Sequence, residues 1–201
     1  MSALPEAEEG DGSLTLEEGK RKVLMLLDEY SSGGELTVDE DINAKMNDFF
    51  DIAQKDVAQW QPILRRRVLT LDGSGSRRLP ADVGQVTHIR KNGRRTADYE
   101  VIDGCLVSEP GDVSALTLDY LAVPKTITRT TDDSYAFEVS EAAANCTPFF
   151  VAAQQLIPDL VIDYAAFYQI YLQMRGMLPR SAGGSGGWGG VRQSLFRGAR
   201  R

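Results

Sequence analysis

The sequence predicts an α+β fold that is mainly α: a helical bundle with a small antiparallel β element inserted between its helices, followed by an extended C-terminal tail. Apolar residues recur at helical spacing in 15–62 and again in 131–179. Between them, 63–130 loses this spacing and carries closely spaced turn signals. The acidic lead 1–14 and the glycine-rich, basic tail 180–201 both have compositions typical of flexible segments.

The overall composition is that of an ordinary soluble globular chain: of 201 residues, 42% are hydrophobic and 25% are charged. No apolar run is long enough for a transmembrane helix, and the acidic N-terminus has no features of a secretory signal. Cys105 and Cys146 form no CxxC pair, so we expect two free thiols. The net charge of −7 is uneven, because residues 1–60 are strongly acidic and only basic charges follow Asp163.

Two helices are expected before the β element. Thr15 with Glu18 forms a capping-box pair that predicts the start of the first helix, and Gly33-Gly34 predicts its end. Thr37 with Glu40 repeats the pair, and Pro62 ends the second helix. The expected apolar faces are Val23, Leu26, Leu27 and Tyr30 on the first helix, and Ile42, Met46, Phe49, Phe50, Ala53, Val57 and Trp60 on the second.

The inserted element reads as roughly four to six short antiparallel strands. Strands are expected at 67–71, 86–90 and 115–123. The dipeptides Asn92-Gly93 and Asp103-Gly104 are typical of two-residue hairpin turns.

This element is rich in basic residues, which allow two interpretations. They could form a surface that faces anions or nucleic acid. They could equally be solvated strand edges that pair with acidic neighbours and protect against edge pairing, and the absence of interleaved aromatic residues favours this second reading. The residues are Arg65, Arg66, Arg67, Arg77, Arg78, Arg90, Lys91, Arg94 and Arg95.

The longest apolar and aromatic stretch is 148–178, preceded by a short helix that begins at Ser140 and Glu141. Pro148 suits a first helical position, and Pro158 predicts a kink or a break. The surface is too apolar to stand alone, so it must pack on another helix, on another subunit, or on both. Its helical stripes are Phe149, Ala152, Ala153 and Leu156 before Pro158, then Leu160, Tyr164, Phe167, Tyr168 and Tyr171. Phe150 is a further packing candidate.

The C-terminal tail combines a flexible linker with anchor residues, as a docking segment does. Bare linkers do not need large aromatic residues, and exposed aromatics usually mark contacts. The candidate docking residues are Trp188, Arg192, Leu195, Phe196, Arg197, Arg200 and Arg201.

No catalytic motif of the GxSxG, HExxH or phosphate-binding-loop type occurs in a strand–helix setting in this sequence. His88 is the only histidine, which argues against a zinc site or a histidine-based triad. Asp132-Asp133 is better explained by helix capping or loop solvation than by metal binding, and Cys146 is better explained as a buried structural thiol than as a nucleophile. We therefore expect no enzyme, no cofactor and no metal.

Five segments of the chain form a recognisable set: MNDFFDIAQKDVAQ, LPADVGQVTHI, VIDGCLVSEPGDVSALTLDYLAVPKTIT, FEVSEAAANCTPFFVAAQQLIPDL and AAFYQIYLQMRGML. Together they resemble the head–tail connector (adaptor) proteins of tailed bacteriophages. The resemblance covers roughly residues 36–178, and the glycine-rich tail and the acidic lead depart from it.

This resemblance implies a structural virion protein, made in the bacterial host cytoplasm, that forms a ring of about twelve copies in the neck of the particle. The portal protein would lie above the ring, with the C-terminal residues holding it, and a stopper or tail-terminator protein would lie below. DNA would pass through the bore without specific binding, since acidic walls repel the duplex. The alternative is a nucleic-acid-binding module that uses the arginine-rich β region and the basic tail.

Overall fold

The computed structural model describes residues 13–27, 40–154, 156 and 163–179, and divides the chain into two compact units. A helical unit is formed by the described parts of 1–61 and 124–180, and a β unit is formed by 62–123. The α+β class with predominating helices is confirmed. Several predicted features lie outside the described residues: 1–12 of the acidic lead, Tyr30, Gly33-Gly34, Thr37, Pro158, Leu160 and the tail. In the described part of the chain, no helix is both long and apolar enough to span a membrane.

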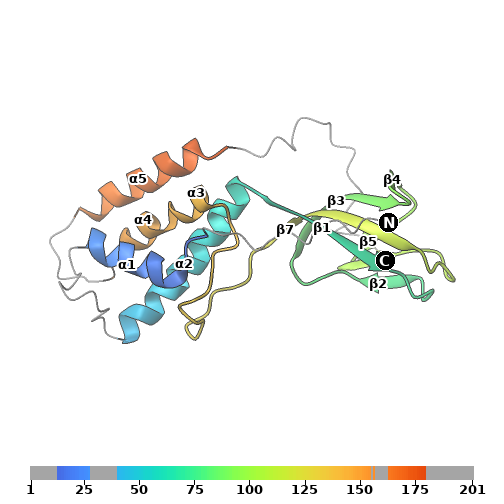
Figure 1. The fold of residues 1–201 in the computed structure, drawn as a ribbon, viewed down its shortest axis with the longest axis horizontal. Helices are drawn as coiled ribbons and strands as arrows, with labels where there is room; N and C mark the ends of the chain where they lie inside the picture. Colours follow the sequence, from blue (N-terminus) through green and yellow to red (C-terminus); the bar gives the residue numbers. More distant parts are fainter. Residues whose placement is uncertain (1–12, 28–39, 155, 157–162, 180–201) are drawn as a thin grey trace, which may run out of the picture. The chain divides into compact units, whose positions relative to one another are not determined.

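The helical unit contains five helices within the described ranges (Figure 1). They are α1 (Leu16–Leu26), α2 (Glu40–Trp60), α3 (Glu141–Ala144), α4 (Thr147–Ala152) and α5 (Tyr164–Met177). The capping box at the start of α1 is confirmed, because Thr15 Oγ1 accepts from the Glu18 amide and the Glu18 carboxylate accepts from the Thr15 amide. Ser140 caps α3 through a single bond, because its side chain accepts from the Ala143 amide.

The predicted helix faces are nearly right, with differences in burial at two places. On α1, Leu24 is buried in place of the expected Leu26, because the stripe that meets the core is Val23, Leu24 and Leu27. On α2, Phe50 is fully buried whereas Phe49 is only partly covered. The Phe50 ring lies 5.5 Å from the Phe137 ring, centroid to centroid.

The segment after the β unit corrects the predicted boundary of the β element. The β unit ends at Val123 rather than near residue 130, and the chain then packs against α2. The buried Gln54 side chain donates to the Lys125 carbonyl and accepts from the Glu138 amide, at 3.2 and 3.0 Å. The Asp51 carboxylate accepts from the Ile127 amide at 2.9 Å. Polar side chains on α2 therefore hold this segment to the helical unit.

The β unit has seven strands, slightly more than expected: β1 (Ile63–Thr70), β2 (Ser76–Arg78), β3 (Val83–Lys91), β4 (Arg94–Arg95), β5 (Glu100–Ile102), β6 (Cys105–Val107) and β7 (Ala115–Ala122). They form a four-stranded antiparallel sheet in the order β1-β7-β3-β4 and a three-stranded sheet in the order β2-β6-β5 (Figure 1). Both predicted hairpin turns are confirmed, since Asn92 and Asp103 have φ of 52° and 49°.

The core of the β unit follows from strand alternation. On β7, Leu116, Leu118, Tyr120 and Ala122 are buried, and the residues between them are not. These side chains form one cluster with Ile89 of β3 and with four residues outside the long strands: Leu71, Tyr99, Val101 and Leu106. The β unit thus has its own hydrophobic core.

Candidate protein interface on helix α5

The described residues offer no assembled catalytic or metal centre. No group of three or more His, Cys, Asp or Glu side chains that could hold a metal occurs among them. Cys146 is a buried free thiol that donates to the Ala142 carbonyl, and burial raises its pKa. Asp133 binds the buried Lys20 ammonium at 2.6 Å, and Asp132 accepts from the Ser134 amide. Each of these side chains therefore has a structural explanation.

Helix α5 is fastened to α2 through Asp56. The Tyr171 hydroxyl donates to Asp56 Oδ2, and Arg175 Nη1 lies 2.5 Å from the same oxygen. The Arg175 guanidinium also lies over the Trp60 ring, 5.1 Å from its centroid. Burial, and then the hydrogen bond to Asp56, raise the pKa of Tyr171, so the phenol stays a donor.

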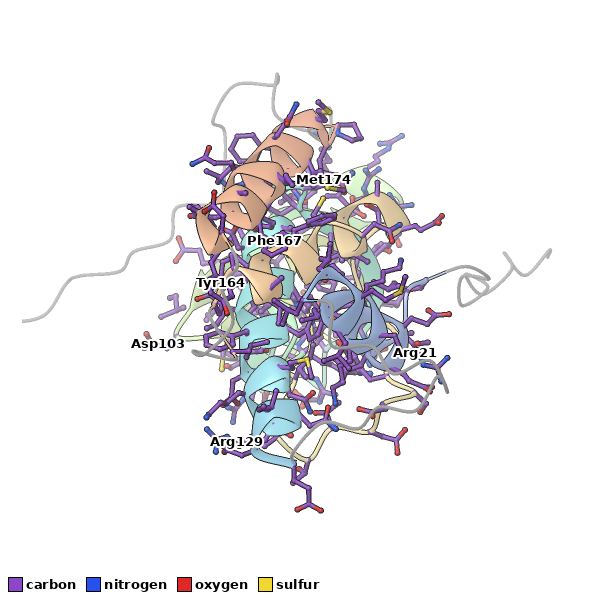
Figure 2. All side chains as sticks on the ribbon, turned by 90° about the vertical axis from the view of Figure 1, so that its left-hand side faces the viewer. Arg21, Asp103, Arg129, Tyr164, Phe167 and Met174 are labelled. Atoms are coloured by element: carbon purple, nitrogen blue, oxygen red, sulfur yellow. The ribbon has the colours of Figure 1, made fainter. Side chains whose placement is uncertain are left out.

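An aromatic cluster completes the inner side of α5. The Phe150 ring of α4 lies 5.2 Å from the Tyr171 ring and 6.5 Å from the Tyr168 ring, measured between centroids. Figure 2 labels Tyr164, Phe167 and Met174 on α5. Helical spacing puts all three on the same side of the helix as Tyr171. These three side chains are partly covered, and only Tyr171 on α5 is fully buried.

The opposite side of α5 is exposed and carries no charge. Seven residues occupy this arc, and all are exposed: Ala165, Ala166, Gln169, Ile170, Gln173, Gly176 and Met177. Met177 is 71% exposed and Ile170 is 38% exposed. Arg175 is the only charged residue of the helix, and it is turned to Asp56. We call these seven residues the outer face of α5.

The other long helices of the unit differ from α5 in this respect. The exposed residues of α1 include Glu18, Arg21 and Lys22, and those of α2 include Glu40 and Asp41. A solvated helix face is normally charged or strongly polar, as these two are. A neutral face with small and apolar residues is typical of a surface that another protein covers.

The predicted packing residues fall into three groups. Phe50 and Tyr171 are buried, and Tyr168 is 42% exposed. Phe49, Trp60, Phe149, Phe150, Tyr164 and Phe167 are partly covered. The expected docking residues Trp188, Arg192, Leu195, Phe196, Arg197, Arg200 and Arg201 lie outside the described residues.

Sequence reasoning missed Asp56 and Arg175. Tyr171 and Arg175 are four residues apart, which places them on one side of a helix and could have suggested a shared partner. No sequence signal identifies Asp56 among the acidic residues of α2, since its role depends on where α5 packs.

The basic residues of the β unit are partly neutralised. Five of the nine form ion pairs: Arg65 with Asp82, Arg66 and Arg90 with Asp119, Arg77 with Asp72, and Lys91 with Asp112. The unit contains nine basic and eight acidic residues in total, so its net charge is close to zero.

Comparison with known proteins gives no family for this chain, because neither a protein-family model nor a curated protein matches it.

Proposed function

We propose that this chain is a structural virion protein, a head–tail connector that forms a ring on the portal and joins the capsid to the tail around the DNA channel. The observation that carries the proposal is the outer face of α5, seven exposed residues without a charge. Such a face needs a protein neighbour, and a ring supplies one for every copy. The proposal includes no catalytic role, no cofactor and no specific binding of the DNA that passes.

The size of the outer face favours assembly on a template over a stable free dimer. A 14-residue helix is about 21 Å long. A strip about 10 Å wide along it has a footprint of roughly 200 Å², whereas a standard stable interface buries about 800 Å² per partner. We expect the free chain to be a monomer or a small oligomer, and the ring to close when copies gather on the portal.

The proposal includes a protein partner on each side of the ring. The tail carries anchor residues such as Trp188 and Phe196 among arginines, which suit insertion into the portal. A stopper or tail-terminator protein is proposed to lie below. The net charge of −7 suits a channel wall that repels DNA.

The test of the ring compares two matched double variants in the phage that encodes this chain. Ile170→Glu with Gln173→Glu places two charges on the outer face of α5. Ile52→Glu with Gln59→Glu places the same two charges on exposed positions of α2. Thermal unfolding should show that both variants fold. Electron microscopy should show filled, tailless heads for the α5 variant only.

Two results would contradict different parts of the proposal. Normal tailed particles with the α5 variant would exclude that face as an interface. A particle reconstruction that places the wild-type chain as isolated monomers away from the portal axis would refute the connector function itself. A deletion of 182–201 tests the tail separately, and it should leave unfolding unchanged but prevent joining to portal-bearing heads.

A further inference from the structure

The tip of the β3–β4 hairpin carries four positive charges in two directly opposed pairs. The two-residue turn Asn92–Gly93 has φ of 52° and 77°. In the antiparallel register, Arg90 lies opposite Arg95 and Lys91 lies opposite Arg94. Like charges directly opposed on neighbouring strands destabilise a hairpin. Folding alone therefore does not favour this arrangement.

The two cations on β3 are only partly neutralised. Arg90 Nε lies 2.8 Å from Asp119 Oδ2, but Asp119 also binds Arg66, with Arg66 Nε 2.6 Å from Oδ1. One carboxylate is thus shared between two guanidinium groups. Lys91 Nζ lies 3.6 Å from Asp112 Oδ2, which is a long ion pair.

The two cations on β4 lack even this compensation. Arg94 and Arg95 are both exposed, and neither forms an ion pair with any residue that the structure describes. Asp119 and Asp112 hold the β3 cations in place, so the tip keeps a fixed excess of positive charge. An arrangement that breaks a local folding rule without internal compensation points to a ligand of opposite charge.

The charges lie on both faces of the hairpin. Successive strand residues point to opposite faces, so Lys91 shares the face of the buried Ile89 while Arg90 shares the face of Asp119. Directly paired residues lie on the same face, so Arg94 shares the face of Lys91 and Arg95 shares the face of Arg90. The acidic surface of a protein would neutralise one face only. The phosphate rows of a duplex border a groove on both sides, and the major groove admits a two-stranded ribbon.

We propose that the tip of the β3–β4 hairpin is a phosphate-binding element that contacts the backbone of double-stranded DNA across a groove without reading its base sequence. Guanidinium groups match phosphate oxygens bidentately, which suits Arg94 and Arg95 as the contacting residues. The inference does not rest on the proposed ring.

The strength of the contact follows from the number of phosphates. With two to four phosphates neutralised by each copy, the logarithm of the affinity should fall with the logarithm of salt concentration with a slope of about −2 to −4. A single copy with a net charge of −7 should bind weakly and only at low salt.

The test is a nuclear magnetic resonance titration of the full-length, ¹⁵N-labelled chain with a random-sequence duplex of about 20 base pairs, a length that covers roughly two helical turns. At low ionic strength, about 25 mM salt, charge–charge interactions are only weakly screened. Under this condition the largest chemical-shift changes should fall on the backbone amides of 90–95. Arg94→Gln with Arg95→Gln should weaken binding at least about tenfold and reduce the salt slope by about 2. The matched control is Arg77→Gln with Arg78→Gln on exposed β2, which removes the same charge and should change binding less than about twofold.

Three outcomes would overturn the proposal. One is the absence of shifts at 90–95 at the lowest salt. Another is an equal loss of binding in the hairpin variant and the β2 variant, which would show that binding depends on net charge alone. The third is displacement of the duplex by polyglutamate at an equal concentration of charge, which would identify acidic protein surfaces as the partner. Thermal unfolding should show that both variants fold, with the hairpin variant at or slightly above the wild-type midpoint, because it loses two pairs of opposed like charges.

Discussion

Tyr171 on α5 donates a hydrogen bond to the Asp56 carboxylate on α2, and these two residues are 115 positions apart in the chain. Arg175 binds the same carboxylate oxygen from the next turn of α5. The bond fixes which side of α5 is turned inward, because Tyr171 is the one fully buried residue of that helix. The charge-free outer face is a consequence of this orientation, so the Asp56 contact controls what α5 presents outward.

Tyr171→Phe should lower the free energy of unfolding of the helical unit by about 1.5–3 kcal/mol, the usual range for a hydrogen bond to a charged group. The ring and its contacts with Phe150 remain, so the loss reports the hydroxyl alone. Tyr168→Phe is the matched control, since Tyr168 is 42% exposed and should change stability by less than about 0.5 kcal/mol. Denaturant unfolding followed by circular dichroism measures both, and equal effects would argue against the Asp56 contact.

Stability should also depend on Tyr171 at alkaline pH. Burial, and then the hydrogen bond to Asp56, raise the pKa of Tyr171 in the folded chain above the unfolded value of about 10. The folded state therefore holds this proton more tightly than the unfolded state. Its contribution is complete below about pH 10 and is lost as pH rises toward the folded pKa. Unfolding curves should show a decline above pH 10 that Tyr171→Phe makes shallower. Parallel curves would contradict the assignment.

Phe50 and Phe167 should differ in their cost of truncation. Phe50 is fully buried against Phe137, so Phe50→Ala should cost about 3–5 kcal/mol. Phe167 and Phe150 are only partly covered in the isolated chain. Phe167→Ala should then cost roughly 1–2 kcal/mol. A comparison of unfolding midpoints decides this, and equal losses at Phe50 and Phe167 would show that α5 is buried more deeply than described.

The sequence was sufficient for elements with strong local signals. The capping box at Thr15 and Glu18, the turns at Asn92 and Asp103, and the end of α2 before Pro62 each depend on neighbouring residues only. The boundary of the β element depends on distant contacts instead. The segment after Val123 contains no signal that separates a β loop from a loop that packs on a helix. Its place is set by Asp51 and Gln54.

The candidate interface shows the same limit. Helical spacing correctly predicted an inward stripe on α5 that includes Tyr164, Phe167 and Tyr171. It could not show that the remaining arc stays exposed, because exposure depends on which other elements reach the helix. The absence of charge in 164–174 was visible in the sequence, but it is equally typical of a helix buried on all sides. Only the fold separates these cases.

Two glycines in helices should respond to alanine with opposite signs. Gly176 lies in the last turn of α5, where an added Cβ would meet no atom within 4 Å. Gly176→Ala should therefore stabilise the free chain by about 0.5–1 kcal/mol, through helix propensity alone. Gly19 in α1 lies against the Phe50 ring, and an added Cβ would stand 3.0 Å from Phe50 Cζ.

Gly19→Ala should accordingly destabilise the chain by about 1–3 kcal/mol, because the closely packed ring would have to shift. Denaturant unfolding monitored at the helical circular dichroism band measures both variants, and each serves as the control for the other. Since propensity favours alanine at both positions, only the difference in local space can give opposite signs. A gain at Gly19 would show that α1 and α2 are more loosely packed than the Phe50 contact indicates. A loss at Gly176 in the free chain would show that α5 is already covered there, and the outer face would then be unavailable to a neighbouring copy.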